Sequence, residues 1–355
     1  MVKLYSRGIK LAVLTGSILL ATGAQASEWA DRTTISGFSS AVFQISDNKT
    51  AFNGISHDGT FSNTRFGINI NSSVNDKISL ASQLISSKGD DNYNTKIDWA
   101  FVSYAVTDDI SVRTGKVKYP VGIVNEYESV GYAYPWITPP QSYYTLSSQG
   151  PQVTREAYTG ASVLWQKSMG DINYSVDLFG GEVALESMTI RAMKGITVSA
   201  DWNDAVMLQV SSYSGTMDNP MMAMMDGEQH SSNVVGLKIN MADVIAYAEY
   251  ANVDMGMFDA GTGSSWYGSV GYRMGSFLPY ANFGMYEKGK GAMLMMASAH
   301  NKQYVATAGV KYDILPGTDI KLEMSKVHLS AGAGLFEAVV ADDVTVYGVA
   351  IDVVF

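Results

Sequence analysis

Hydrophobic and polar residues alternate with a period of two along most of this chain. In residues 65–71, for example, Phe66, Ile68 and Ile70 alternate with arginine, glycine and asparagine. Residues 304–313 repeat the pattern, with mainly tyrosine, alanine and valine on one side and threonine, glycine, lysine and aspartate on the other. Because successive side chains of a β-strand point to opposite faces, this alternation predicts strands with one apolar and one polar face.

Sixteen such stretches are long enough to cross a membrane as tilted strands, which need about nine or more residues. An even number of strands brings both chain ends to the same side of a barrel. The sequence therefore predicts an all-β fold, a sixteen-stranded antiparallel transmembrane β-barrel. The predicted strands cover 35–46, 61–71, 77–87, 96–106, 110–119, 156–168, 171–181, 187–201, 204–214, 231–240, 243–253, 265–274, 277–287, 303–313, 318–329 and 343–355.

Short and long connections between these stretches alternate. Connections after even-numbered strands are brief, and those after odd-numbered strands are mostly much longer. Outer-membrane barrels have this arrangement, with tight turns on the periplasmic side and long loops outside. Two packed soluble sheets, the alternative fold, would explain the period of two but not the loop lengths. The brief connections are 72–76, 107–109, 169–170, 202–203, 241–242, 275–276 and 314–317.

Both ends of the chain support the barrel prediction. The first residues carry basic side chains, then a short apolar stretch over 11–21 and the sequence Ala24-Gln25-Ala26, a pattern that signal peptidase cleaves. We therefore expect a signal peptide over 1–26 and a barrel domain over 27–355. The chain finishes at Phe355 after an alternating apolar run, as a lipid-facing last strand would. The expected location is the outer membrane of a Gram-negative bacterium.

Charge and composition narrow the function classes. Removing residues 1–26, which contain three basic and no acidic residues, lowers Lys+Arg from 24 to 21 against 34 Asp+Glu, so the mature charge is 21 − 34 = −13. That balance disfavours nucleic-acid partners. The chain has no cysteine, which excludes disulfides and thiolate metal sites. No later segment supplies about 20 mainly apolar residues, so a membrane helix is not expected.

The connection after the fifth strand, about 119–155, is far longer than any other. It contains five of the eight prolines and seven tyrosine and tryptophan residues. Its aromatic content argues against disorder. A sixteen-stranded barrel is wide enough for an aqueous channel, so folding this loop inward would bury its aromatic residues and narrow the channel. An external lid, or a clasp onto a neighbouring subunit, is the alternative.

Four short motifs lie in the second strand, at the start of the long loop, within the loop and at the chain end. They are SNTRFG at 62–67, GKVKYPVG at 115–122, YPW at 134–136 followed by Pro139-Pro140, and Tyr347 eight residues before Phe355. Together they resemble the sixteen-stranded trimeric porins of Gram-negative outer membranes, and the middle two are most similar to the DcaP-like porins. DcaP-like proteins can carry an N-terminal helical extension, whereas the first strand here starts at residue 35, soon after the expected cleavage site.

The resemblance implies a constriction formed by the inward-folded loop after strand five. Glu126 and Glu128 of the loop would then face basic residues of the wall, and opposed charges across a narrow passage favour polar over apolar solutes. Arg113 and Lys116 have opposite strand parity, so both reach the lumen only if a bulge intervenes, for example at Gly115. A rim ion pair or a loop anchor is the alternative role of each. The candidates are Arg65, Arg113, Lys116, Lys118, Glu126, Glu128 and Arg155.

The predicted function is passive diffusion of small hydrophilic solutes and ions through a homotrimer in contact with outer-membrane lipid and lipopolysaccharide. The DcaP-like resemblance implies small anionic solutes such as carboxylates, and the basic residues at 113–118 agree, whereas the acidic mature chain does not. A surface receptor or adhesin with a plugged lumen is the second hypothesis. A barrel hydrolase is the least favoured, because the four histidines lie mostly in different loops without a compact catalytic motif.

No metal or cofactor is expected. Thioethers suit Cu(I), but flexible apolar packing is the commoner role of methionine. Acidic residues of the external loops could share Ca²⁺ or Mg²⁺ with lipopolysaccharide phosphates, although such carboxylates ordinarily keep a surface soluble. The methionines in predicted loops are Met217, Met221, Met222, Met224, Met225, Met255, Met257, Met293, Met295 and Met296.

Overall fold

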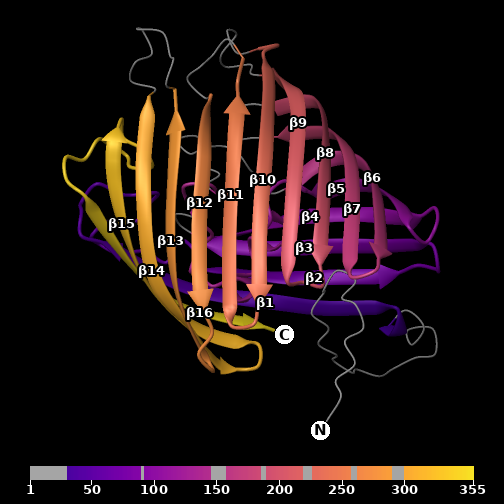
Figure 1. The fold of residues 1–355 in the computed structure, drawn as a ribbon, viewed down its shortest axis with the longest axis horizontal. Coiled ribbons are helices and arrows are strands. Elements are labelled where there is room, and N and C mark those ends of the chain that lie inside the picture. The colour runs from indigo at the N-terminus through magenta and orange to yellow at the C-terminus, as the bar shows by residue number, and fades with distance from the viewer. Residues whose placement is uncertain are drawn as a thin grey trace.

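The strands close into a single antiparallel β-barrel (Figure 1). The computed structural model describes residues 30–88, 92–144, 157–184, 189–218, 226–256, 262–289 and 300–355; the expected signal peptide over 1–26 lies outside them. The prediction of sixteen antiparallel strands is confirmed. They are β1 (Thr33–Ser46), β2 (Arg65–Ser73), β3 (Ile78–Lys88), β4 (Tyr93–Ala105), β5 (Ile110–Lys118), β6 (Ala157–Met169), β7 (Ile172–Ala184), β8 (Thr189–Trp202), β9 (Val206–Asp218), β10 (Gln229–Met241), β11 (Val244–Asp254), β12 (Gly263–Tyr272), β13 (Phe277–Lys288), β14 (Asn301–Leu315), β15 (Thr318–Ala331) and β16 (Val344–Val354).

The last strand closes the barrel against the first. Nine residues of β1 pair with β16, and Gly37 and Phe355 exchange backbone hydrogen bonds of 2.8 and 3.0 Å. The Phe355 ring stacks on Phe66 of β2 with ring centroids 6.4 Å apart. The end of the chain therefore pairs the edge that an open sheet would leave exposed.

The outer face of the barrel is apolar where the alternation predicts it. On β2, Phe66 is 40% exposed, whereas Arg65 points the other way and bonds to Tyr134 of the long loop. On β15, Leu322 and Met324 are exposed on the outer face. Lys321, the residue before Leu322, points inward and is fully buried. Large apolar side chains are exposed in this way on strands all around the barrel, which suits a lipid environment.

Seven short connections lie at one end of the barrel, and β16 also finishes there (Figure 1). Gly170 and Ala242 adopt left-handed φ angles of 63° and 50° in two of them, as tight hairpins require. At the other end most connections are longer, as the sequence predicts, although 89–92 and 185–188 are short. Among the described residues, no helix is long and apolar enough to cross a membrane.

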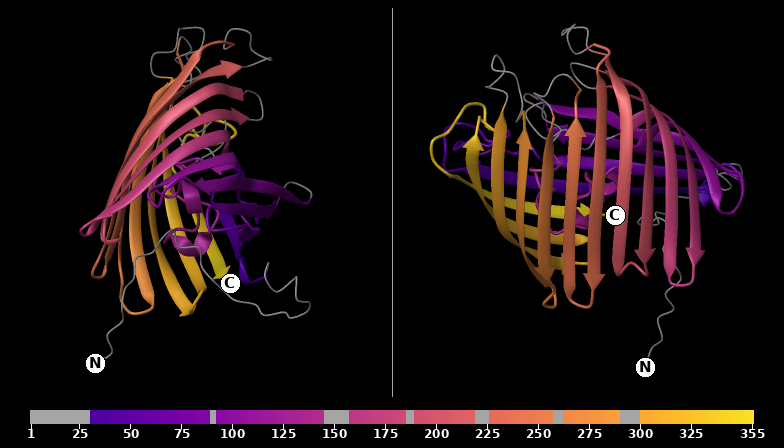
Figure 2. Two further views of the ribbon diagram at one scale, coloured as in Figure 1. Left: turned by 90° about the vertical axis from the view of Figure 1, so that its right-hand side faces the viewer. Right: turned by 45° about the horizontal axis from the view of Figure 1, so that its top comes forward.

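The long loop after β5 lies inside the barrel. Its two short 3-10 turns, Asn125–Tyr127 and Gly131–Ala133, are surrounded by the strands (Figure 2). The main hydrophobic cluster joins buried loop residues such as Tyr119, Val124 and Trp136 to inward-facing residues of β5 to β13. The prediction that this loop folds inward is confirmed.

Two further loops pack over one side of the external opening. Phe52, in the connection from β1 to β2, packs on Phe336, in the connection from β15 to β16, with ring centroids 5.0 Å apart. Asn53 N donates to the Leu335 carbonyl at 2.8 Å, and Glu337 N donates to the Ala51 carbonyl at 3.1 Å. These loops and buried residues of β13 to β16 near the same end of the barrel form a second hydrophobic cluster.

Candidate pore constriction

The start of the long loop is fixed to the wall at β8, β9 and β11. The Pro120 carbonyl accepts hydrogen bonds from Thr197 on β8, at 2.7 Å, and from Gln209 on β9, at 3.3 Å. Glu249 of β11 then accepts the Ile123 backbone N–H at 2.7 Å. Buried backbone groups need such partners, and here inward-facing side chains of the wall supply them.

Glu249 also holds the end of the described part of the loop. Its carboxylate accepts the hydroxyl of Tyr144 and, at 2.7 Å, that of Tyr267 on β12. Burial and the neighbouring carboxylate raise the pKa of Tyr144 well above 10, so its hydroxyl stays protonated and donates. One carboxylate thus ties together two positions of the loop and two strands.

The middle of the loop reaches the opposite side of the barrel. Trp136 donates its indole N–H to Ser269 of β12 at 2.9 Å, and the Ile137 N–H donates to Glu323 of β15 at 3.2 Å. Tyr280 of β13 donates to the same carboxylate at 2.7 Å. The loop therefore crosses the lumen and is not a flap over the opening.

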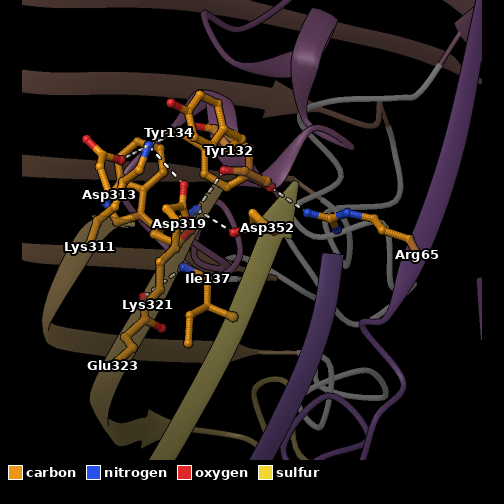
Figure 3. A network of polar contacts seen from close by, with 12 residues as sticks. Arg65, Tyr132, Tyr134, Ile137, Lys311, Asp313, Asp319, Lys321, Glu323 and Asp352 are labelled. Atoms are coloured by element: carbon orange, nitrogen blue, oxygen red, sulfur yellow. Dashed lines mark hydrogen bonds and ion pairs between the residues drawn. The ribbon is translucent and has the colours of Figure 1, made fainter. Parts of the chain in front are cut away.

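Two inward-facing lysines, the fully buried Lys321 and the partly buried Lys311, hold the turn before Tyr134 (Figure 3). Lys321 on β15 donates to the carbonyls of Gly131, at 2.6 Å, and Trp136, at 2.9 Å, and forms an ion pair of 2.9 Å with Asp352 on β16. Lys311 on β14 donates to the Tyr132 carbonyl at 2.9 Å. Because these ammonium groups are charged donors, their bonds to carbonyl oxygens are stronger than bonds between neutral groups.

The interior is filled unevenly. On β11, every inward-facing residue from Ile245 to Val253 is buried beneath the loop. On β2, by contrast, the inward-facing Arg65, Asn69 and Asn71 keep partial exposure. The part of the lumen that remains open to water therefore lies along β2 to β4, between this wall and the loop.

Arg65 is the predicted site residue on β2. Its guanidinium donates to the Tyr134 hydroxyl at 2.5 Å, and that hydroxyl donates in turn to the Glu128 carbonyl at 2.8 Å. Burial keeps the Tyr134 hydroxyl protonated by raising its pKa. Arg65 thus connects the wall to the same loop segment as Glu128, the second predicted acid.

Arg113 and Lys118, both on β5, are paired with acids that sequence reasoning missed. Arg113 forms an ion pair with Asp177 of β7 and donates to Ser162 of β6 at 3.0 Å. Lys118 forms an ion pair of 3.0 Å with Asp98 of β4. Asp98 is fully buried and also accepts a bond from Gln83. The two bases therefore lie at the wall but are largely neutralised there.

Lys116 does not join these residues. The β5–β6 ladder runs from Ile110 to Lys118 without a register shift, so the bulge expected at Gly115 is not seen there, although Gly115 has a φ of 129°. Lys116 lies two residues after Thr114 on the same strand, and Thr114 pairs with the outward-facing Val102. Its ammonium donates to the Ile97 carbonyl at 2.6 Å. This lysine belongs to the outer face of the barrel.

The loop acid Glu126 is exposed to the open part of the lumen. Its enclosure by the barrel raises the pKa of its carboxyl, because confined water solvates charge less well than bulk water; Arg113 and Lys118 lower this pKa, and Asp177 raises it. These influences place Glu126 within electrostatic reach of the paired wall charges. Arg155, the last predicted residue, lies outside the described residues.

The missed residues share one property. Asp98, Asp177, Glu249, Glu323 and Lys321 are charged residues at inward-facing positions of strands. The alternation shows that they face inward, but only the folded chain shows that they meet the loop. In the sequence, the signal for such loop anchors is a charged residue at an inward-facing position of a predicted strand.

Two of the methionines predicted to lie in loops are in packed surroundings, and one of them, Met217, lies in β9 instead. Met217 and Met255 are buried in the main hydrophobic cluster, as apolar packing residues. In the described part of the chain, no group of three or more His, Cys, Asp or Glu side chains is placed to hold a metal ion. The methionines at 221–225, 257 and 293–296 lie outside the described residues.

Comparison with known proteins shows similarity of fold. No family model matches the sequence, and no curated protein matches it. The outer membrane channel DcaP of Acinetobacter baumannii matches with a TM-score of 0.59 and 12% identity, over 91% of this chain and 97% of that chain. OmpF of Salmonella typhi gives 0.60 and 13% over 91% and 97%, and the trimer form of Vibrio cholerae OmpT gives 0.57 and 12% over 91% and 99%. The chain thus has the barrel fold of Gram-negative outer-membrane porins and channels.

Proposed function

We propose that this protein is an outer-membrane porin, a passive diffusion channel for small hydrophilic solutes and ions. The observation that carries the proposal is a loop fixed across the lumen at Glu249, Glu323 and Lys321 while the inner face of β2 stays partly exposed. A barrel narrowed in this way, with a polar wall along the remaining space, can pass water and small polar solutes by diffusion. No step in such transport needs a cofactor.

Export, location and assembly are part of this proposal. The signal-like sequence over 1–26 would direct the chain to the periplasm, and the apolar outer face would place it in the outer membrane. A homotrimer agrees with the trimer form of Vibrio cholerae OmpT, a structural neighbour. Outer-membrane lipid and lipopolysaccharide would then surround the assembly.

The charges of the described constriction support weak cation preference over the anion preference that the DcaP-like resemblance implies. Three bases face four acids, and 3 − 4 = −1. Two of the bases are already held in ion pairs by wall acids, so the exposed Glu126 is the least compensated charge. The residues counted are Arg65, Arg113, Lys118, Asp98, Asp177, Glu126 and Glu128.

Recording from the purified protein in planar bilayers tests the channel. A porin gives stepwise insertions with conductance that is linear in voltage, and proteoliposomes containing it swell in small sugars. The dense packing along β8 to β16 makes a plugged receptor the competing function. A folded barrel that inserts without conducting would support the receptor and reject the porin.

The ion preference has its own test. In a salt gradient, the double variant Glu126→Gln plus Glu128→Gln is expected to move the reversal potential toward anions, because it removes two negative charges from the passage. Asp109→Asn is the matched control, since Asp109 pairs with Lys167 at a short turn outside the constriction. An unchanged reversal potential in the double variant would remove these acids from the filter.

A further inference from the structure

Two aromatic side chains face the open part of the lumen, where an aqueous channel ordinarily presents polar ones. Leu80 of β3 and Val102 of β4 pair with each other and are exposed on the outer face. Phe101 and Trp99 lie one and three residues before Val102 on β4, so both face inward. Both are half-buried, and their ring centroids lie 5.7 Å apart. We call Trp99 and Phe101 the aromatic pair.

The aromatic pair lies on the external approach to the constriction. β4 begins at the end of the barrel with the longer loops and runs toward the short turn 106–109, so Trp99 is farther out than Phe101. The Arg113 guanidinium lies 5.9 Å from the centroid of the Phe101 ring. A solute moving inward along this wall would pass Trp99, then Phe101, then Arg113.

The two bases of β5 on this wall are matched by acids. Arg113 is held by Asp177, and Lys118 by Asp98. A charged solute therefore gains little binding free energy from this wall. A solute ring gains binding free energy when its apolar face leaves water and stacks on an aromatic surface. Glu126 stands within electrostatic reach of the same Arg113 and Lys118, and its exposed carboxylate can accept hydrogen bonds from hydroxyl groups.

We propose that the aromatic pair Trp99 and Phe101, together with the exposed Glu126 of the loop, forms a binding site for uncharged ring-shaped solutes with many hydroxyls, of which pyranosides are the simplest class. One face of the ring stacks on Trp99 or Phe101, and the hydroxyls at its edge bond to Glu126. This inference rests on the proposed porin function and names the solute class that the passage favours.

Current recordings with matched sugars test the site. Methyl glucoside and a linear glucose oligosaccharide are added at the external side, and the open-chain hexitol sorbitol serves as the ring-free comparison. The two pyranosides are expected to interrupt or damp the current at lower concentration than sorbitol. In Trp99→Leu, which keeps an apolar side chain but no aromatic face, the blocking constant of the pyranosides is expected to rise about three- to tenfold.

Controls separate the site from the barrel. Trp99→Phe keeps a ring and is expected to retain most of the effect, and Trp165→Leu, on the outer face of β6, is expected to leave it unchanged. If Trp99→Leu fails to fold, Phe101→Leu gives the same test. Equal blocking by pyranosides and sorbitol, or tighter binding of the open-chain carboxylate gluconate, would overturn the inference while leaving the porin intact. Loss of all conductance in the unaltered protein would instead reject the porin function.

Discussion

Gly131 occupies a position where a larger residue would have to displace the side chains of Asp352 and Ser40. A Cβ atom there would lie 2.0 Å from Asp352 Oδ1 and 2.6 Å from Ser40 Oγ, where the loop touches the inner wall. Gly131→Ala should therefore push the loop away from the Lys321–Asp352 pair and cost about 1–3 kcal/mol of unfolding free energy. The urea midpoint of the folded barrel measures this.

The barrel contains a suitable control for that substitution. Gly268 on β12 has an ordinary φ and open space around an added Cβ, so Gly268→Ala is expected to change stability by about 0.5 kcal/mol or less. Equal urea midpoints for the two variants would show that the loop does not press on the wall at Gly131.

The ion preference should depend on pH through Glu126. Because the pKa of this carboxyl is raised above 4.5, it takes up a proton at a higher pH than an ordinary glutamate and loses its charge as the pH falls. The cation preference is therefore expected to weaken between neutral and mildly acidic pH. Reversal potentials of the unaltered protein and of Glu126→Gln should differ at pH 7 and converge on acidification, and a constant difference would contradict the shift.

Residue types could be predicted better than residue pairs. The sequence identified Arg65, Arg113, Glu126 and Glu128 as constriction candidates. In the structure Tyr134 joins Arg65 to the backbone of Glu128, and Glu126 is exposed. The sequence could not reveal that Asp177 neutralises Arg113, because 64 positions separate them along the chain and only the pairing of β5 with β6 and of β6 with β7 brings them together. Strand parity did not separate Lys116 from Lys118 either, because the two share it and only Lys118 reaches the buried Asp98.

The loop is an element without strands of its own, and buried carboxylates hold it. Glu249→Ala and Glu323→Ala would each leave a loop N–H, that of Ile123 or Ile137, without its acceptor, at a cost of about 1–3 kcal/mol. We expect faster protease cleavage within 121–142 in the folded protein and noisier current. Glu182→Ala, at an exposed position of β7, is the control, and unchanged cleavage in both Glu249→Ala and Glu323→Ala would contradict this anchoring role.

The existence of this element followed from its length, prolines and aromatic residues, but its path did not. Aromatic content shows that a loop must pack on something. Which wall it packs on depends on single inward residues such as Ser269 and Thr197, which look like ordinary polar strand positions in the sequence. The strands were predictable because their signal repeats every two residues. The path of the loop was unpredictable, because the residues that anchor it follow no repeat.

The molecule as a whole depends on closure. Deleting Val344–Phe355 would leave β1 and β15 with unpaired edges, so we expect no compact, heat-modifiable barrel and no conductance. Phe355→Leu keeps the backbone bonds to Gly37 and is expected to form the barrel. A truncated chain that still migrates as a compact form on unheated gels would show that fifteen strands suffice.

The seam between β1 and β16 has a consequence for protein engineering. Because Gly37 and Phe355 are joined by backbone hydrogen bonds, a short peptide can bridge the old termini of the barrel domain without crossing it. New termini can be opened in the two-residue turn Ala242–Asp243, between β10 and β11. Such a circular permutant keeps the pairing of every strand. It moves the free ends from the β1–β16 seam to the opposite wall of the barrel, where a reporter can be fused away from the passage.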